Sequence, residues 1–161
     1  MLDQEAFKTA KSQAFKHLSY RDRSKKEIAE HLAKKGHTAS IVQAIIQDLE
    51  NLNYINDDRF ASEWSRWRIE VKNFGRKRLF HELIAKGVST QIIESTLDTL
   101  YNSDPEPGLA LACANKKLAS LHGLEPEKKT RRLAQYLQRR GFSADIIYET
   151  LKIFTIKDGG K

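Results

Sequence analysis

Leu32-Ala-Lys-Lys-Gly36-His-Thr38 is the stretch that decides the fold of this chain, because its outline occurs three times. The other two copies are Leu83-Ile-Ala-Lys-Gly87-Val-Ser89 and Leu137-Gln-Arg-Arg-Gly141-Phe-Ser143. In each copy a leucine lies four residues before a glycine, a basic residue precedes the glycine, and a hydroxyl residue follows it by two positions. The glycines are 51 and 54 residues apart in a chain of 161 residues, a spacing that indicates internal repeats.

The residues around each glycine predict two helices joined by a short turn. Glycine adopts positive φ at a helix C-terminus without a Cβ clash, and the basic residue before it is favourable at the negative pole of the helix. The hydroxyl residue is able to cap the N-terminus of the next helix. Apolar residues occupy the same six offsets in all three copies, namely Ile28, Leu32, Ile41, Val42, Ile46 and Leu49, then Leu79, Leu83, Ile92, Ile93, Leu97 and Leu100, then Leu133, Leu137, Ile146, Ile147, Leu151 and Phe154.

A further helix is predicted before each pair, over residues 2–19, 57–73 and 106–122. The composition agrees, because 17 Leu and 15 Ala against three Val favour helices over strands. We therefore expect an all-α protein of nine helices. Its three three-helix modules, over residues 1–55, 56–103 and 104–161, form a tandem array that is elongated or curved, with a frayed tail at residues 157–161.

Phe60, Trp64, Trp67 and Val71 form one stripe on the helix predicted over residues 57–73. Their spacing of four, three and four is that of a single helix face, which favours a position in the core. Tryptophan rings also stack on unpaired bases, so a nucleic-acid contact through Trp64 or Trp67 stays open as the second interpretation.

An excess of 28 Lys and Arg over 21 Asp and Glu gives a net charge of +7, which favours a polyanionic partner. Some of these cations begin the predicted second helix of each module, at the positive end of its dipole, where acids are normally preferred. Free N–H groups, the dipole and the added cations together predict a site for phosphate or carboxylate in each module. A basic face kept for solubility is the alternative. The predicted partner- and DNA-binding residues are Lys25, Lys26, Arg76, Lys77, Arg78, Lys128, Lys129, Arg131 and Arg132.

The usual constellations of catalytic or metal-binding residues are not recognisable in the sequence. The five histidines never pair at i, i+4 and lie near no pair of cysteines, which argues against a zinc site. Gly75-Arg-Lys-Arg-Leu79 lacks the pattern of a phosphate-binding P-loop, and Glu70-Val-Lys72, which superficially resembles a nuclease motif, lies on a predicted helix. The helix dipole alone explains Asp57 and Asp58 in a first helical turn. We expect no enzymatic activity, no catalytic residue, no cofactor and no metal.

The cysteine content, the length of the apolar runs and the first residues of the chain indicate its cellular location. A single cysteine, Cys113, lies in an apolar stretch and cannot form an internal disulfide, so we expect it to be a small core residue in a reducing compartment. The longest apolar run, from Leu109 to Ala114, is far shorter than the ~20 residues that span a membrane. The first five residues contain two acids, Asp3 and Glu5, and lack the basic and apolar regions of a secretory signal. We expect a cytoplasmic monomer without membrane contact.

Four motifs follow one another along nearly the whole chain. They are Ala14-x-x-x-Leu18-Ser19-x-Arg21-x-Arg23-Ser24-x-x-Glu27, Leu32-x-x-Lys35-Gly36, Asn53-Tyr-Ile-Asn-Asp-Asp-Arg-Phe-Ala61 and Gly75-x-x-x-Leu79-x-x-Glu82-Leu83-x-x-Lys86-Gly87-Val88. In this order and spacing they resemble the RecX regulators of the bacterial recombinase RecA. Asn53 stands where that family commonly has Gly, and Arg76 where Pro often follows the glycine, both at helix edges.

The resemblance implies a curved array of three-helix modules that binds RecA filaments on DNA, along the filament groove. It also implies weak binding to single- and double-stranded DNA without sequence preference. The implied activity is inhibition of RecA, and with it regulation of DNA repair, recombination and the SOS response. A helix-turn-helix transcription regulator is the alternative, because two helices joined through glycine on a basic protein also describe that motif. Leu32, Leu83 and Leu137 argue against it, since the motif usually has a small residue four positions before the glycine.

Overall fold

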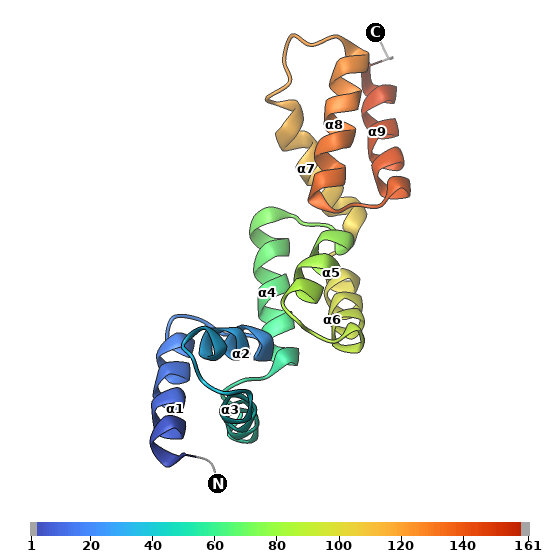
Figure 1. Cartoon of the computed structure of the whole chain (residues 1–161). Helices are drawn as coiled ribbons and strands as arrows, with labels where there is room; N and C mark the ends of the chain where they lie inside the picture. Colours follow the sequence, from blue (N-terminus) through green and yellow to red (C-terminus); the bar gives the residue numbers. More distant parts are fainter. Residues whose placement is uncertain (1–2, 159–161) are drawn as a thin grey trace. The chain divides into compact units, whose positions relative to one another are not determined.

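The computed structural model describes residues 3–158, and these form helices and connecting turns without a strand (Figure 1). The predicted all-α class and the nine helices are confirmed for this part of the chain. The helices are α1 (Gln4–Leu18), α2 (Lys25–Lys34), α3 (Ala39–Asn51), α4 (Asp57–Lys72), α5 (Arg76–Ala85), α6 (Thr90–Ser103), α7 (Glu106–Leu118), α8 (Pro126–Arg140) and α9 (Ala144–Asp158).

The described residues group into two compact units. The first unit contains residues 3–63 and 83–93, and the second contains residues 64–82 and 94–158. The division passes through α4, α5 and α6. The module boundaries at 55/56 and 103/104 stay a prediction.

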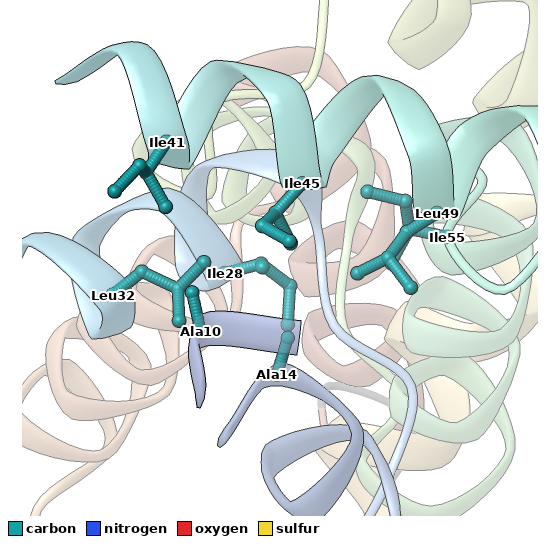
Figure 2. Packing of buried hydrophobic residues seen from close by; sticks show 8 residues of the cluster. All are labelled: Ala10, Ala14, Ile28, Leu32, Ile41, Ile45, Leu49 and Ile55. Atoms are coloured by element: carbon teal, nitrogen blue, oxygen red, sulfur yellow. The ribbon is translucent and has the colours of Figure 1, made fainter. Parts of the chain in front are cut away.

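The core of the first unit lies between α1, α2 and α3 (Figure 2). Figure 2 shows the α1 alanines facing larger side chains from the other two helices. Alanine at these positions lets α1 lie close to α2 and α3, because the distance between packed helix axes depends on the size of the side chains at the contact. Fully burying each large aliphatic side chain contributes about 1.5–3 kcal/mol to stability. The buried residues are Ala10, Ala14, Ile28, Leu32, Ile41, Ile45, Leu49 and Ile55.

A second core lies between α7, α8 and α9, within the second unit. Leu133 and Leu137, four residues apart on α8, are buried against two small residues of α7, Ala110 and Ala114. Cys113 is 2% exposed, which confirms it as a small core residue. Burial raises the pKa of this thiol, so the group favours its neutral form. The complete buried set is Ala110, Cys113, Ala114, Leu121, Leu133, Leu137 and Phe142.

The repeated pattern read from the sequence is confirmed at its helix ends and in its apolar positions. Gly36, Gly87 and Gly141 have φ of 90°, 77° and 93°, the left-handed conformation expected after a helix. The hydroxyl groups of Thr38, Ser89 and Ser143 each accept a hydrogen bond of 3.4 Å from the main-chain N–H three residues later. All eighteen apolar positions are buried or half-buried.

The interpretation of the α4 stripe as core is wrong for half of its members. Phe60 is buried and Trp64 is half-buried, but Trp67 is 51% and Val71 52% exposed. The buried face of α4 is offset from the stripe, because small and aliphatic residues occupy it. These are Ala61, Ser65 and Ile69.

Some helix ends also differ from the prediction. Helix α7 ends at Leu118, with Ala119 as its C-cap, instead of reaching residue 122. Helix α4 ends at Lys72 because Asn73 takes a positive φ of 49°. Helix α1 begins at Gln4, and residue 2, where the prediction began it, lies outside the described residues. Helix α9 extends to Asp158, into the predicted frayed tail, and residues 159–161 lie outside the described residues.

Candidate functional site

The N-terminus of α2 is already occupied by the chain's own acceptors. The main-chain N–H of Lys25 donates to Asp57 Oδ1 at 2.9 Å, and the Ser24 hydroxyl accepts from the N–H of Glu27 at 3.2 Å. Asp57 is the first residue of α4 and is 7% exposed. The prediction of free N–H groups is therefore wrong for Lys25 and Glu27.

The same arrangement occurs at the N-terminus of α5. The N–H of Arg76 donates to Glu106 Oε1 at 2.8 Å, and Glu106 is the first residue of α7. The N–H of Lys77 donates to the carbonyl of Gly141 at 3.1 Å. These two N–H groups are therefore not free, because a carboxylate and a carbonyl from within the chain occupy the positive pole of the helix. Binding of an anion by the cations of this helix end stays a prediction.

The N-terminus of α8 differs from these two. Its N-cap, Glu125, makes no side-chain capping hydrogen bond, and Pro126 follows. Proline has no main-chain N–H, so this helix end has one donor fewer that needs a partner.

Four of the nine predicted binding cations have internal partners. Lys25 forms an ion pair with Glu50, and Lys26 Nζ donates to the carbonyl of Ala85 at 3.1 Å. Arg76 forms ion pairs with Glu94 and, at 2.7 Å, with Asp98. Arg78 Nη1 donates to the carbonyl of Arg139 at 3.0 Å.

The other five predicted cations form no ion pair within residues 3–158. All but Lys129, which is half-buried, are exposed. Four of them lie on the first half of α8, and the fifth lies in the first turn of α5. Their role in binding stays a prediction, and they are Lys77, Lys128, Lys129, Arg131 and Arg132.

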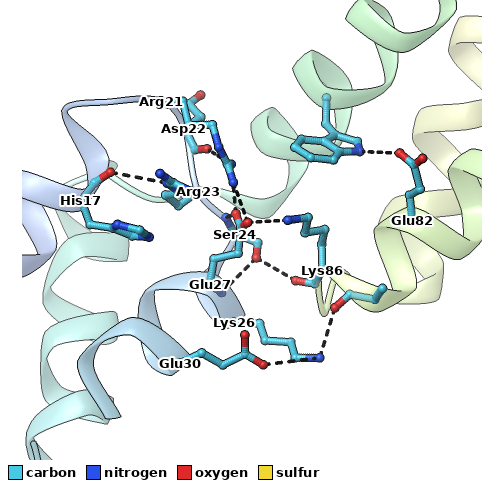
Figure 3. Close-up of polar contacts among 12 residues, drawn as sticks. His17, Arg21, Asp22, Arg23, Ser24, Lys26, Glu27, Glu30, Glu82 and Lys86 are labelled. Carbon is cyan, nitrogen blue, oxygen red and sulfur yellow. Dashed lines mark hydrogen bonds and ion pairs between the residues drawn. The ribbon is translucent and has the colours of Figure 1, made fainter. Parts of the chain in front are cut away.

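Ser24 and Glu27 tie the start of α2 to the end of α5 within the first unit (Figure 3). The Ser24 hydroxyl donates to the carbonyl of Lys86 at 2.7 Å. Glu27 accepts from Arg21 at 2.7 Å and from Lys86 Nζ at 2.6 Å. Burial raises the pKa of the Glu27 carboxyl, but the hydrogen bonds from Arg21, Lys86 and the Ser24 N–H outweigh burial and lower this pKa to about 2. This carboxylate is a structural group and is not available to a ligand.

The second unit contains a pocket of about 340 Å³ in which cations surround two aromatic rings. We call it the cationic pocket. It lies where α4 and α8 end and α5 begins. Its lining residues are Lys72, Phe74, Arg78, Tyr136, Arg139 and Arg140.

Two arginines of the cationic pocket are fixed by main-chain acceptors and aromatic rings. Arg140 Nη1 donates to the carbonyl of Lys72 at 2.7 Å, and its guanidinium carbon lies 5.4 Å from the Phe74 ring centroid and 5.0 Å from that of Tyr136. The guanidinium carbon of Arg78 lies 3.9 Å from the Phe74 centroid. Arg78 Nε also donates to Glu82 Oε1 at 3.2 Å. Each guanidinium has five donors, so both retain donors for an anion after these contacts. Within residues 3–158, Lys72 and Arg139 are exposed and form no ion pair.

Sequence reasoning found one residue of this pocket, Arg78, and missed the others. It explained Arg139 and Arg140 by their favourable position at the negative pole of a helix dipole, and it gave Lys72 and Tyr136 no role. The available signal was Gly75, because a glycine at the start of α5 permits close approach of another segment. A Cβ at Gly75 would lie 2.6 Å from the carbonyl carbon of Gly141, next to Arg140.

Four cations and two rings in one pocket favour an anion that also has an apolar or planar part. Within residues 3–158, no group of three or more His, Cys, Asp or Glu side chains is placed to hold a metal ion. None of the helices in this part of the chain is long and apolar enough to cross a bilayer.

Three family models match successive parts of the chain. Residues 10–49 match the first three-helix domain of RecX, residues 56–97 the second, and residues 106–151 the third. The crystal structure of RecX from Lactobacillus salivarius is similar to this structure, with a TM-score of 0.81 and 25% sequence identity over 94% of this chain and 98% of that one.

Two curated proteins illustrate the similarity in sequence. The regulatory protein RecX of Pelodictyon phaeoclathratiforme is 34% identical over 143 residues, which cover 89% of this chain and 87% of that protein. The regulatory protein RecX of Bacillus licheniformis is 33% identical over 139 residues, which cover 86% of this chain and 52% of that protein. The chain therefore spans about half the length of this Bacillus relative.

Proposed function

Because the chain belongs to the RecX family of regulatory proteins, we propose that it inhibits RecA recombinase by binding RecA filaments on DNA. Inhibition of RecA modulates DNA repair, recombination and the SOS response. The protein acts by binding, without enzymatic activity, metal or cofactor, as a monomer in the cytoplasm. Its own affinity for single- and double-stranded DNA is weak and independent of sequence.

The observation that supports this proposal most directly is the cationic pocket. Its cations, Lys72, Arg78, Arg139 and Arg140, come from segments far apart in the chain and meet in one place. A concentration of positive charge of this kind attracts phosphates or acidic side chains, and both occur in a protein filament on DNA.

The nine predicted cations contribute in two ways under this proposal. Lys77, Lys128, Lys129, Arg131 and Arg132 contact the filament directly, because their side chains are not engaged in ion pairs within the described chain. Lys25, Lys26 and Arg76 add to the positive charge of the chain while holding helix ends together, and Arg78 belongs to the cationic pocket.

The test is the ATPase activity of RecA on single-stranded DNA. The purified chain, at an equal or smaller molar ratio to RecA, is expected to suppress ATP hydrolysis. Arg139→Glu in the cationic pocket should weaken the suppression several-fold, because it places a negative charge in a site for anions. Lys8→Glu, which makes the same change of charge at an exposed position of α1, is the control and should inhibit like the wild type.

Two results would contradict the proposal. A wild-type chain that leaves RecA activity unchanged would remove inhibition as the function. Selection from random duplexes that returned one consensus sequence would support the helix-turn-helix regulator instead, because phosphate contacts carry no sequence preference.

A further inference from the structure

Helix α4 leaves two large apolar side chains in solvent beside cations. Trp67 is 51% exposed, and Val71, one turn later on the same helix, is 52% exposed. The guanidinium carbon of Arg68 lies 5.6 Å from the Trp67 ring centroid, and Lys72 Nζ lies 5.9 Å from it. The buried face of α4 is elsewhere, so packing of the core does not account for a tryptophan at position 67.

Lys72 connects this exposed ring to the cationic pocket. Its ammonium group is near Trp67, and its side chain also lines the pocket with Phe74, Arg139 and Arg140. All of these residues belong to the second unit. The result is one surface with an exposed indole at one side and a group of cations at the other.

We propose that this surface binds an unpaired nucleic-acid strand, with Trp67 as the platform on which a base stacks and the cationic pocket as the site of the strand's phosphates. Base stacking on aromatic side chains beside a positively charged groove is how proteins bind single strands without sequence preference. A duplex presents the same phosphates but keeps the faces of its bases stacked inside. An acidic peptide satisfies the cations but need not offer a planar group to the indole.

This inference rests on the proposed function, in which the chain meets DNA in RecA filaments. Its new element is the residue that distinguishes an unpaired strand from a duplex. It assigns Trp67 a binding role and predicts a preference for single strands at this surface. The inhibition of RecA is a separate measurement, so the two proposals can fail independently.

The experiment measures binding of the full chain to a labelled thymidine oligonucleotide of about 15 nucleotides, without RecA and at low salt. Trp67→Ala is expected to weaken single-strand binding about tenfold or more, which is the loss of one stacked base, and to leave duplex binding unchanged within about twofold. Trp67→Phe should restore most of the affinity. Val71→Ala, an equally exposed position on the same helix, is the matched control and should bind like the wild type.

Fluorescence gives a second readout that does not depend on these affinities. The chain has two tryptophans, so Trp64→Phe leaves Trp67 as the only indole. The oligonucleotide should quench its emission in a saturable way, whereas a duplex of the same length and polyglutamate should not. Arg139→Glu should weaken binding of single and double strands alike and reduce the dependence on salt.

Three results would overturn the inference. They are unchanged single-strand binding in Trp67→Ala, an equal loss for single and double strands in that variant, and equal quenching of Trp67 by polyglutamate. The last would identify the surface as a site for acidic polypeptide. A wild-type chain that binds the oligonucleotide through Trp67 but does not inhibit RecA would remove the proposed function alone.

Discussion

The hydroxyl of Ser24 donates a hydrogen bond of 2.7 Å to the main-chain carbonyl of Lys86, so the start of α2 meets the chain just after α5. The second unit repeats this relationship, because the N–H of Gly75 donates to the carbonyl of Arg140 at 2.8 Å. In both places a helix N-terminus meets the carbonyl end of another helix, and the opposite poles of the two dipoles face one another.

Ser24→Ala is expected to lower the free energy of unfolding by about 2 kcal/mol, because it removes the cap of α2 and leaves the carbonyl of Lys86 without this donor. Thr38→Ala is the control, since Thr38 also caps a helix but is exposed. Its expected cost is about 1 kcal/mol or less. Chemical denaturation of both variants tests the difference, and equal losses would mean that the contact with Lys86 contributes nothing.

Glu27→Gln is expected to destabilise the chain by about 1.5–3 kcal/mol, because the neutral amide loses charge-assisted hydrogen bonds from Arg21 and Lys86. The pKa of Glu27 is lowered to about 2, so its contribution is complete above about pH 4.5 and is lost as pH falls toward 2. Stability measured across this range should decline less steeply in the variant. Glu30→Gln, which changes an exposed carboxylate 3.7 Å from Lys26, should have little effect.

The imidazole rings of His17 and His31 are stacked with their centroids 4.0 Å apart. Burial lowers the pKa of both rings, and the charge of Arg23 lowers that of His17 further. The unfolded chain therefore binds protons at these sites more readily than the folded chain, and acidification below about pH 6.5 lowers the free energy of unfolding. Melting temperatures at pH 7.5 and 5.5 should differ less in His17→Gln than in the wild type. An equal difference in the variant and the wild type would contradict this explanation.

Gly141→Ala is expected to cost more stability than Gly36→Ala. Both glycines have φ near 90°, so alanine at either site costs about 1–2 kcal/mol in backbone strain. A Cβ at Gly36 meets nothing within 4 Å, whereas a Cβ at Gly141 would lie 2.5 Å from the main-chain nitrogen of Arg78 and also against its Cβ. Thermal unfolding followed by circular dichroism tests the order, and a larger loss in Gly36→Ala would contradict it.

Charge reversal at Arg76 and at Lys77 should have opposite effects on stability. Arg76→Glu places a carboxylate next to Glu94 and Asp98 and is expected to destabilise the second unit. Lys77 is exposed, and Lys77→Glu should leave the free energy of unfolding unchanged or raise it by about 0.3–1 kcal/mol at most, because an acid is favourable in the first turn of α5. The same variant should inhibit RecA less than the wild type. Unchanged inhibition by Lys77→Glu would show that Lys77 does not contact the filament.

Local patterns allowed the helices and their ends to be predicted from the sequence. Positive φ at Gly36, the cap at Thr38 and burial of Leu32 each depend on a few neighbouring residues and on the period of a helix. The sequence also led to Cys113 as a core residue. These features follow from the chemistry of single residues at fixed offsets.

The candidate site depends on contacts that no local pattern contains. Arg140 and Lys72 are 68 positions apart, and the pocket exists only because their segments meet. Asp57 was explained by the dipole of its own helix, yet it accepts a hydrogen bond from the N–H of Lys25. Trp67 has the spacing of a core residue but is half exposed, because the period of a helix gives the angle between side chains and not which face the rest of the fold covers.

The hydrogen bond from Lys25 to Asp57 has a consequence for the order of events during synthesis. Asp57 is 32 positions after Lys25, so a ribosome that adds about 5–20 residues per second makes the donor some 2–6 s before its acceptor. Glu106 likewise follows Arg76 by 30 positions. Each of these helix starts is therefore completed by a residue translated later, and the nascent chain acquires its stability in steps from the N-terminus onward.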